Sequence, residues 1–334
     1  MNKATIYDVA GAAKVSLATV SRALNNPEKV KPETREKVLK VIKDLGYKPN
    51  AFAKGLASRK STIVAVIVSD MSRASVAEMM NGIADIARVY NYSLLLYILK
   101  SEEAKESEIL KDVIAAQVDG ILYLNDEINS EQHALLKDIQ DNYNIPIVLA
   151  NTLYPDASDL IAVSIDYELA GYEVTKSLIS EGRKNIYMLS TARKYMVNDL
   201  KEKGYIRAIT EAGMEPKIMR TSGDISINRA HFEEFFKNNE VDGVVAVRDS
   251  IAVSFMNVML DAGKKIPEDI SIFGFQNTKY ASLARPKLST VDLPIYDIGA
   301  VGMRLLTKKM VGDEVAKDAM VTLPHSIIYR ETNK

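Results

Sequence analysis

From residue 61 onward, the sequence alternates short apolar runs, rich in β-branched residues, with longer amphipathic stretches. Seven runs have the character of strands: 63–68, 93–99, 120–124, 145–150, 185–190, 243–247 and 270–275. Seven stretches between or after them have the apolar spacing of helices: 76–90, 107–116, 130–141, 167–181, 199–212, 229–237 and 251–262. Nearly continuous apolar strands that are separated by helices indicate parallel sheets covered on both faces. We therefore predict a doubly wound α/β body.

The alternation repeats in two similar halves that meet near residue 160, and segments near 290 and 320 are placed to cross back between them. We expect a two-lobed body over residues 61–334. Its lobes would be roughly 61–160 plus 291–320, and 161–290 plus 321–334. Ligands of such sheets bind at the carboxyl ends of the strands, so we expect a cleft there.

The first 48 residues have a different pattern, typical of a small all-α helix-turn-helix head. Thr5 is placed to cap a helix that begins near Ile6, with Asp8 close to its positive end. Three apolar residues of that helix are spaced to face a small core: Val9, Ala10 and Ala13.

The second helix of this head is expected over residues 17–25, with Ser16 as its N-cap. Val20 and Leu24 would point inward. Four residues lie on the other side, where they would meet base edges and phosphates: Leu17, Ala18, Ser21 and Arg22. A third helix, about 32–45, would place four apolar residues on one side and end at Gly46: Val38, Leu39, Ile42 and Leu45.

The charge distribution also separates the head from the body. Residues 1–60 hold 13 Lys and Arg against 5 Asp and Glu, whereas the other 274 residues hold 30 against 39. A basic segment on a mildly acidic chain is typical of a DNA-binding head, because DNA attracts it through the phosphates.

Composition excludes several other classes. The chain is 47% hydrophobic over 334 residues, enough for a large core, and it has no cysteine and three widely separated histidines, so we expect neither metal nor cofactor. The longest apolar run, 63–68, is too short to cross a membrane, and the N-terminus has no apolar leader, so we expect a cytoplasmic protein. Because P-loop, nucleophile-elbow, zinc-protease and dinucleotide motifs are all missing, we do not expect an enzyme.

Four segments resemble the LacI/GalR family of transcriptional regulators: 7–10 (YDVA), 15–22 (VSLATVSR), 45–50 (LGYKPN) and 51–58 (AFAKGLAS). The resemblance covers the whole chain and implies that the body has the periplasmic-binding-protein fold. It also implies that residues 49–60 form a hinge helix on operator DNA, with Leu56 wedged into the minor groove. The DNA-binding residues would be Thr5, Tyr7, Ser16, Leu17, Ala18, Thr19, Ser21, Arg22, Asn25, Asn50, Ala53, Lys54 and Leu56.

The expected cleft departs from the family's sugar-binding pattern. Sugar-binding members present acidic or amide groups and aromatic rings, whereas this chain has fewer acceptors and more cations at the matching positions. The residues concerned are Asp70, Arg73, Lys201, Arg248 and Gln276. Such a cleft suits an anion such as a sugar phosphate, or it binds no small molecule.

The segment 294–310 suggests that a partner protein binds the surface of the body and controls the DNA affinity. Asp297, Val301, Arg304 and Lys308 share one helix stripe, where two cations beside an apolar rim could clamp a phosphate on a partner protein. An ordinary solvated helix face would have the same pattern. The segment resembles the corepressor-binding helix found in one branch of the family, whose partner is the phosphocarrier HPr phosphorylated on a serine. On that resemblance Arg304 and Lys308 would meet the phosphoserine.

The same resemblance implies that Tyr90, Tyr296 and Asp297 contact the partner's surface. We expect a homodimeric repressor of carbon-catabolite genes, which binds a pseudo-palindromic operator and is controlled by Ser-phosphorylated HPr. Two alternatives remain open: a repressor controlled by a small cleft ligand, and an enzyme with a fused DNA-binding head.

Overall fold

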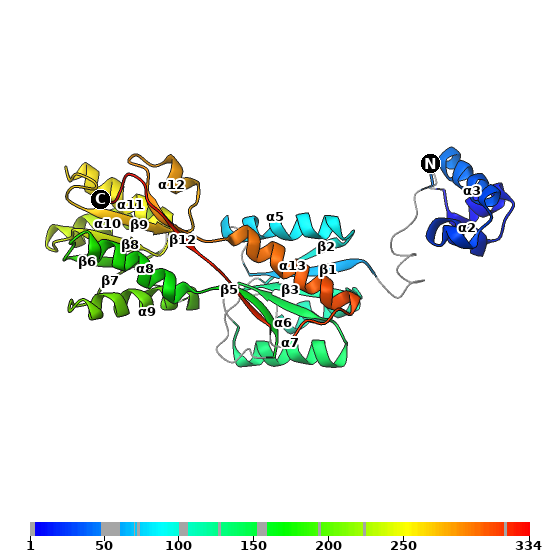
Figure 1. Cartoon of the computed structure of the whole chain (residues 1–334), viewed down its shortest axis with the longest axis horizontal. Coiled ribbons are helices and arrows are strands. Elements are labelled where there is room, and N and C mark those ends of the chain that lie inside the picture. The colour runs from blue at the N-terminus through cyan, green and yellow to red at the C-terminus, as the bar shows by residue number, and fades with distance from the viewer. Residues whose placement is uncertain are drawn as a thin grey trace. The chain divides into compact units, whose positions relative to one another are not determined.

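The computed structural model describes residues 4–47, 61–69, 71, 74–99, 106–125, 128–151, 159–192, 195–222, 225–316 and 319–334. The chain forms two compact units, Met1–Thr62 and Ile63–Lys334. The first is a helical head and the second is a two-lobed α/β body (Figure 1).

The head consists of α1 (Ile6–Ala13), α2 (Leu17–Asn25), the short 3₁₀ helix η1 (Pro27–Lys29) and α3 (Pro32–Leu45). A reciprocal capping box begins α1: the backbone N–H of Asp8 donates to the Thr5 hydroxyl, and the backbone N–H of Thr5 donates to the Asp8 carboxylate. Lys14 ends α1 in the left-handed conformation, with a φ of 52°, and so turns the chain into α2. The predicted helix-turn-helix is therefore formed.

A small core holds the three helices together. Val9, Ala13, Val20 and Val38 are fully buried, whereas Leu24 is only half-buried against them. This core therefore draws on each of the three α-helices of the head.

The prediction was wrong for two residues of α3. Leu39 and Leu45 are about 40% exposed, and Val41 packs on the core with Ile42 instead. Leu39 is rotated by about 100° from Val38 around the helix axis, and Leu45 is the last residue of the helix.

The body contains two largely parallel sheets, as the alternating pattern predicted, and each has six strands among the described residues. The first has the order β11-β5-β4-β3-β1-β2 and the second β12-β10-β9-β8-β6-β7. The strands of the first are β1 (Ile63–Val68), β2 (Ser93–Ile98), β3 (Gly120–Leu124), β4 (Ile147–Ala150), β5 (Ile161–Ile165) and β11 (Met320–Leu323). Those of the second are β6 (Ile186–Thr191), β7 (Lys217–Thr221), β8 (Gly243–Ala246), β9 (Ser271–Phe275), β10 (Ser289–Asp292) and β12 (Ser326–Ile328). All pairings are parallel except that of β10 with β12.

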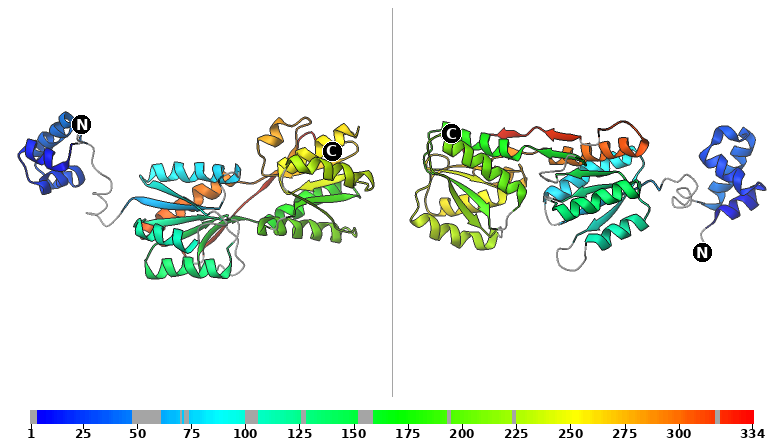
Figure 2. Two further views of the ribbon diagram at one scale, coloured as in Figure 1. Left: turned by 180° about the vertical axis from the view of Figure 1, so that it is seen from behind. Right: turned by 90° about the horizontal axis from the view of Figure 1, so that it is seen from below.

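Helices cover both faces of each sheet (Figures 1 and 2). The first lobe has α5 (Ala74–Val89), α6 (Glu106–Ala115), α7 (Ser130–Asn142) and α13 (Ile295–Val311). The second has α8 (Tyr167–Ser180), α9 (Met196–Glu211), α10 (Ile225–Lys237), α11 (Asp249–Asp261) and α12 (Lys279–Leu283). On β1, Val64 and Val66 face the core beneath α5 and α13, whereas Ala65 and Ile67 face α6 and α7. Alternate residues of a strand thus fill opposite layers.

The chain crosses between the sheets three times, at places that differ from the expected lobe boundaries. Ile161–Ile165 continues the first sheet beside β4, so the first crossing comes after residue 165 instead of 160. Ser289–Asp292 still belongs to the second sheet, and the return begins with α13. The third crossing separates β11 from β12.

Candidate DNA interface and body sites

The N-terminus of α2 is fixed by two hydroxyl side chains. The backbone N–H of Thr19 donates to the Ser16 hydroxyl over 3.1 Å, and the two hydroxyl oxygens lie 2.8 Å apart. A capped helix N-terminus carries a partial positive charge, which suits an approaching phosphate.

The outer face of α2 presents the residues expected to read DNA. Leu17 is 39% exposed, and Ala18, Arg22 and Asn25 are exposed, while the half-buried Ser21 accepts a 3.4 Å hydrogen bond from the Asn25 amide. Val20 and Ala23 on the opposite face are buried. Tyr7 on α1 is 69% exposed, and Thr5 is held in the capping box. The predicted residues of the described head thus lie at the start of α1 and on one side of α2.

The predicted hinge contacts cannot be placed in the same way. Asn50, Ala53, Lys54 and Leu56 lie outside the described residues. So do Asp70 and Arg73 of the expected cleft.

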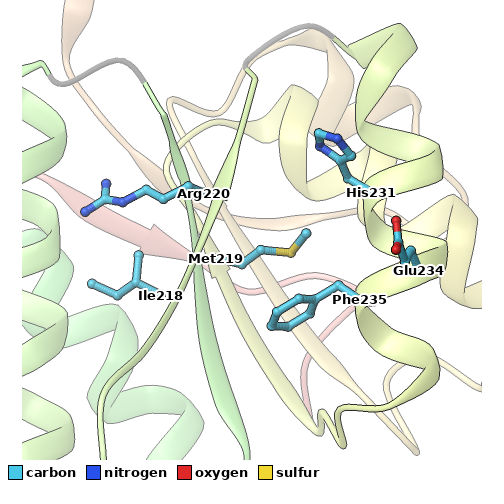
Figure 3. A pocket seen from close by; sticks show the side chains of 6 residues that line it. All are labelled: Ile218, Met219, Arg220, His231, Glu234 and Phe235. Atoms are coloured by element: carbon cyan, nitrogen blue, oxygen red, sulfur yellow. The ribbon is translucent and has the colours of Figure 1, made fainter.

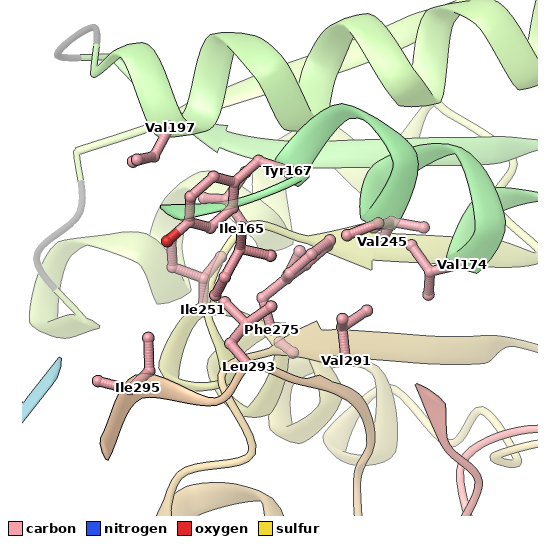
Figure 4. Packing of buried hydrophobic residues seen from close by; sticks show 14 of the residues in the cluster. Ile165, Tyr167, Val174, Val197, Val245, Ile251, Phe275, Val291, Leu293 and Ile295 are labelled. Carbon is pink, nitrogen blue, oxygen red and sulfur yellow. The ribbon is translucent and has the colours of Figure 1, made fainter. Parts of the chain in front are cut away.

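Three expected cleft residues come together at the carboxyl ends of β8 and β9. Lys201 on α9 is only 2% exposed, and its ammonium donates to the backbone carbonyl of Val247, directly after β8, over 3.1 Å. It also lies over the rings of Phe275, at 4.7 Å, and Tyr167, at 5.4 Å. Figure 4 shows these two rings among buried aliphatic side chains. The lysine is therefore enclosed and already has partners.

Arg248 and Gln276 directly follow the residues that contact Lys201. Arg248 precedes α11, and its guanidinium lies 5.8 Å from the ring centre of Tyr195. Gln276 follows β9 with a φ of 97°, a conformation that few residues other than glycine adopt. Both are half-buried. Such strain at the carboxyl edge of a sheet is typical of a functional site.

A buried carboxylate that the sequence analysis missed holds this edge together. Asp249 is 1% exposed and accepts hydrogen bonds from the Thr290 hydroxyl on β10, at 2.6 Å, and from the N–H and hydroxyl of Thr278, at 2.6 and 2.8 Å. Burial raises the pKa of Asp249 to about 6, and these hydrogen bonds oppose the rise. Gly274 leaves room for the group, because a Cβ there would lie 2.4 Å from its Oδ1.

A side-chain hydrogen bond at the carboxyl edge of the first sheet also anchors the first residue of α8, a helix of the second lobe. The hydroxyl of Tyr167, the first residue of α8, donates to the side-chain oxygen of Asn151, which directly follows β4. Both residues are buried. The ring that lies beneath Lys201 is therefore anchored to the first sheet.

The expected corepressor surface lies on α5 and α13, which pack side by side (Figure 1). Glycines allow the two backbones to touch: a Cβ on Gly82 would lie 2.1 Å from the carbonyl oxygen of Tyr296, and one on Gly299 equally close to that of Met79. The Tyr296 hydroxyl donates to Asp85 on α5 over 2.9 Å. This contact raises the pKa of Tyr296.

The predicted stripe on α13 faces outward. Asp297, Arg304 and Lys308 are exposed and Val301 is half-buried. Arg304 and Lys308 form no ion pair with any residue that the structure describes. Lys308 also lies in the last turn, where a cation stabilises the negative end of the helix.

A separate pocket of about 420 Å³ lies between β7 and α10, away from the expected site residues (Figure 3). Met219 and Phe235 face each other across it, with His231 and Glu234 on the helix side. Arg220 at its rim is held by a paired contact with Glu202. Within the described ranges, no group of three or more acidic or histidine side chains is arranged to hold a metal ion.

A helix-turn-helix head followed by a two-lobed α/β body is the architecture of a class of DNA-binding transcription regulators. Residues 5–50 match the model of the bacterial regulatory proteins of the lacI family, and residues 175–333 match the periplasmic binding protein-like domain. The chain belongs to the LacI family of DNA-binding transcriptional regulators.

Relatives cover the full length of the chain. It is 40% identical to catabolite control protein A of Priestia megaterium over 335 residues, and 38% identical to that of Staphylococcus aureus over 333, with 99% of each chain covered. The crystal structure of the transcription regulator CcpA of Lactococcus lactis is 32% identical, with a TM-score of 0.68 over 81% of this chain and 99% of that one. A Lac repressor dimer bound to operator and an anti-inducer has the same fold, with a TM-score of 0.87, 22% identity and 99% of each chain covered.

The described helices include none long and apolar enough to span a bilayer.

Proposed function

We propose that the chain is a homodimeric, operator-binding repressor of carbon-catabolite genes, and that a Ser-phosphorylated HPr-type phosphocarrier controls its DNA affinity. Residues 1–48 would read DNA, 49–60 would form the hinge helix, and 61–334 would dimerise and bind the partner. We place the protein in the cytoplasm, on the nucleoid. The observation that carries the partner assignment is the outward stripe of Asp297, Arg304 and Lys308 beside exposed apolar residues at the end of α5.

The head supports the DNA-reading part of this proposal. The exposed Leu17, Ala18 and Arg22 of α2 would enter the major groove. The hinge would contribute Ala53 and Lys54 in the minor groove, and the Leu56 pair of a dimer would unstack the central base step and bend the operator.

A dimer is proposed because one helix-turn-helix module buries roughly 600–1,000 Å², too little for tight specific binding. The body offers an apolar surface for it. Leu96 and Ile98 are about 40% exposed on β2, the edge strand of the first sheet. Exposed apolar residues on an edge strand are normally covered by a partner.

The topology supports this grouping of the proposed partner contacts. α5 returns from the carboxyl end of β1 to the amino end of the parallel strand β2, and α13 likewise leads to the amino end of β11, so both helices run in the same direction. Gly82 contacts Tyr296 and Ala300, so Tyr90, which directly follows α5, and Arg304, which comes later on α13, lie towards the same end of the pair. Tyr90 is 46% exposed. A phosphoserine, with a charge of about −2, would meet the cations while its flanking apolar residues cover the tyrosine.

This proposal predicts that Ser-phosphorylated HPr tightens operator binding, and that Arg304→Ala together with Lys308→Ala abolishes the effect. The reason is that the phosphate then has no charged partner, whereas the DNA-reading head is unchanged. Gel shifts on operators selected from random DNA would measure the affinity with and without the partner.

The matched control is Lys237→Ala, which removes an exposed cation from the last turn of α10. It should keep the full response to the partner. Equal DNA affinity of the unmodified chain with and without phosphorylated HPr would rule out this mechanism.

A second candidate is control by a small anion in the cleft, such as a sugar phosphate. The strained Gln276 and the half-buried Arg248 at the carboxyl ends of β9 and β8 favour it. Thermal-shift titration with glucose 6-phosphate tests this candidate: a saturable rise that Arg248→Ala removes would support it, and no shift would exclude this ligand.

A further inference from the structure

Lys201 occupies the place where parallel sheets bind their ligands. Its ammonium lies at the carboxyl ends of two adjacent strands, bonded to the Val247 carbonyl after β8 and packed on the ring of Phe275, the last residue of β9. The carboxyl edge of a sheet is the usual position of a small-molecule site. Arg248 and Gln276, which the sequence pattern assigned to the cleft, are the next residues along each strand.

We propose that the side chain of Lys201 itself occupies the ligand position of the expected cleft. Its alkylammonium group fills the place at the carboxyl ends of β8 and β9 where a small molecule would otherwise bind. An ammonium removed from water is stable only with compensating partners. The carbonyl of Val247 and the ring faces of Phe275 and Tyr167 are the partners with which proteins enclose alkylammonium ligands. The side chain thus fills and satisfies the site.

This arrangement also makes Lys201 a positioning residue. The ring of Tyr167 lies under the ammonium, and its hydroxyl donates to Asn151 after β4 of the first sheet. The Tyr167 ring therefore contacts Lys201 at the carboxyl edge of the second sheet while its hydroxyl is anchored at that of the first, without any small molecule. The inference goes beyond the proposed control by a protein partner and does not depend on that partner's identity.

The test removes the Lys201 side chain by mutation and then adds the same chemical group as a free molecule. In the full chain, Lys201→Ala should lower the melting temperature and leave space that n-propylammonium can fill, because this molecule supplies the three carbons and the ammonium that alanine lacks. Added n-propylammonium should then raise the melting temperature of the variant in a saturable way. Neutral n-propanol at the same concentration should not, and the unmodified chain should respond to neither.

Lys201→Met separates charge from volume, because it fills the space without an ammonium. It should fold but show no response to n-propylammonium. The proposal is overturned if the unmodified chain and Lys201→Ala respond alike, or if folded Lys201→Ala does not respond.

Acetylation of the unmodified native chain tests the enclosure of Lys201 even if neither variant folds. Lys201 should react far more slowly than exposed lysines such as Lys237, and by mass spectrometry it should be acetylated only after unfolding. Native-state acetylation of Lys201 at the rate of Lys237 would overturn the proposal.

Discussion

A single carboxylate, that of Asp249, connects three segments at the carboxyl edge of the second sheet. It receives hydrogen bonds from Thr278 in the loop after β9 and from Thr290 on β10, while it begins α11 itself. Gln276, two residues before Thr278, is held in its left-handed conformation within the same loop. The buried acid thus shapes the edge where Arg248 and Gln276 lie.

This acid should make stability depend on pH. The pKa of Asp249 is about 6 in the folded chain, above its ordinary value of 3.8, so the folded state binds the proton more tightly than the unfolded state does. The stability that this proton supplies is fully present below about pH 4 and is lost as the pH rises through 6. The free energy of unfolding of Asp249→Asn, which stays neutral, should therefore rise relative to that of the unmodified chain by about 2 kcal/mol between pH 4 and 7.

Urea unfolding at several pH values measures that difference. Asp261→Asn, at the exposed far end of α11, serves as the control and should show no comparable change. A constant difference between Asp249→Asn and the unmodified chain across this range would contradict the assignment.

Among the elements, the helix pair α5 and α13 depends on glycine for its close packing. Gly82 and Gly299 let the helix backbones touch, and this contact orients the surface that bears Arg304 and Lys308. Gly302, one turn further along α13, faces β3 and β4 at ordinary van der Waals distances instead. Two glycines of one helix therefore have different roles.

Substitution by alanine should distinguish the two positions. Gly299→Ala would place a methyl group 2.1 Å from the Met79 carbonyl oxygen, so the helices must separate, with an expected loss of about 1–3 kcal/mol. Gly302→Ala meets Leu122 and Ala150 at 3.4–3.5 Å and should stabilise the helix by up to about 1 kcal/mol. Chemical denaturation of both variants checks the signs. A stabilising Gly299→Ala would disprove the close approach.

The periodicity of the sequence was sufficient to predict most elements but not their assignment to a lobe. The seven predicted strands all form, because each is a compact apolar run. β5 was missed as a strand because Ile161–Ile165 directly precedes a helix, without the turn signal that marks the other runs. β7 was missed because Lys217 and Arg220 break the apolar pattern of an edge strand.

Site residues that lie on a single helix could be predicted from the sequence. Those that come together from distant segments could not. The stripe of α13 follows from spacing along one helix. The enclosure of Lys201 depends on Val247, Phe275 and Tyr167, which come from three other parts of the chain. No local pattern in the sequence brings these four residues together.

At the scale of the whole molecule, the exposed apolar residues of β2 suggest dimerisation. Leu96 and Ile98 leave apolar area on the exposed edge of the first sheet. If this edge is a dimer interface, a charge placed there must be buried without a partner.

Replacing Leu96 and Ile98 together by lysine should convert dimer to monomer in sedimentation velocity and weaken operator binding. Ser93→Lys adds a charge to an exposed position of the same strand and should leave the dimer intact. If the double variant sediments as the unmodified chain does, the interface lies elsewhere.

The C-terminal segment has a consequence for the order of events during synthesis. β11 and β12 complete both sheets, and the buried Thr332 bonds to Ile272 on β9 and to Ser289 on β10. During synthesis, the N-terminal part of a chain emerges from the ribosome first. The DNA-binding head can therefore fold while the body still lacks a strand from each lobe, so a newly made chain has its helix-turn-helix before either sheet of its body is finished.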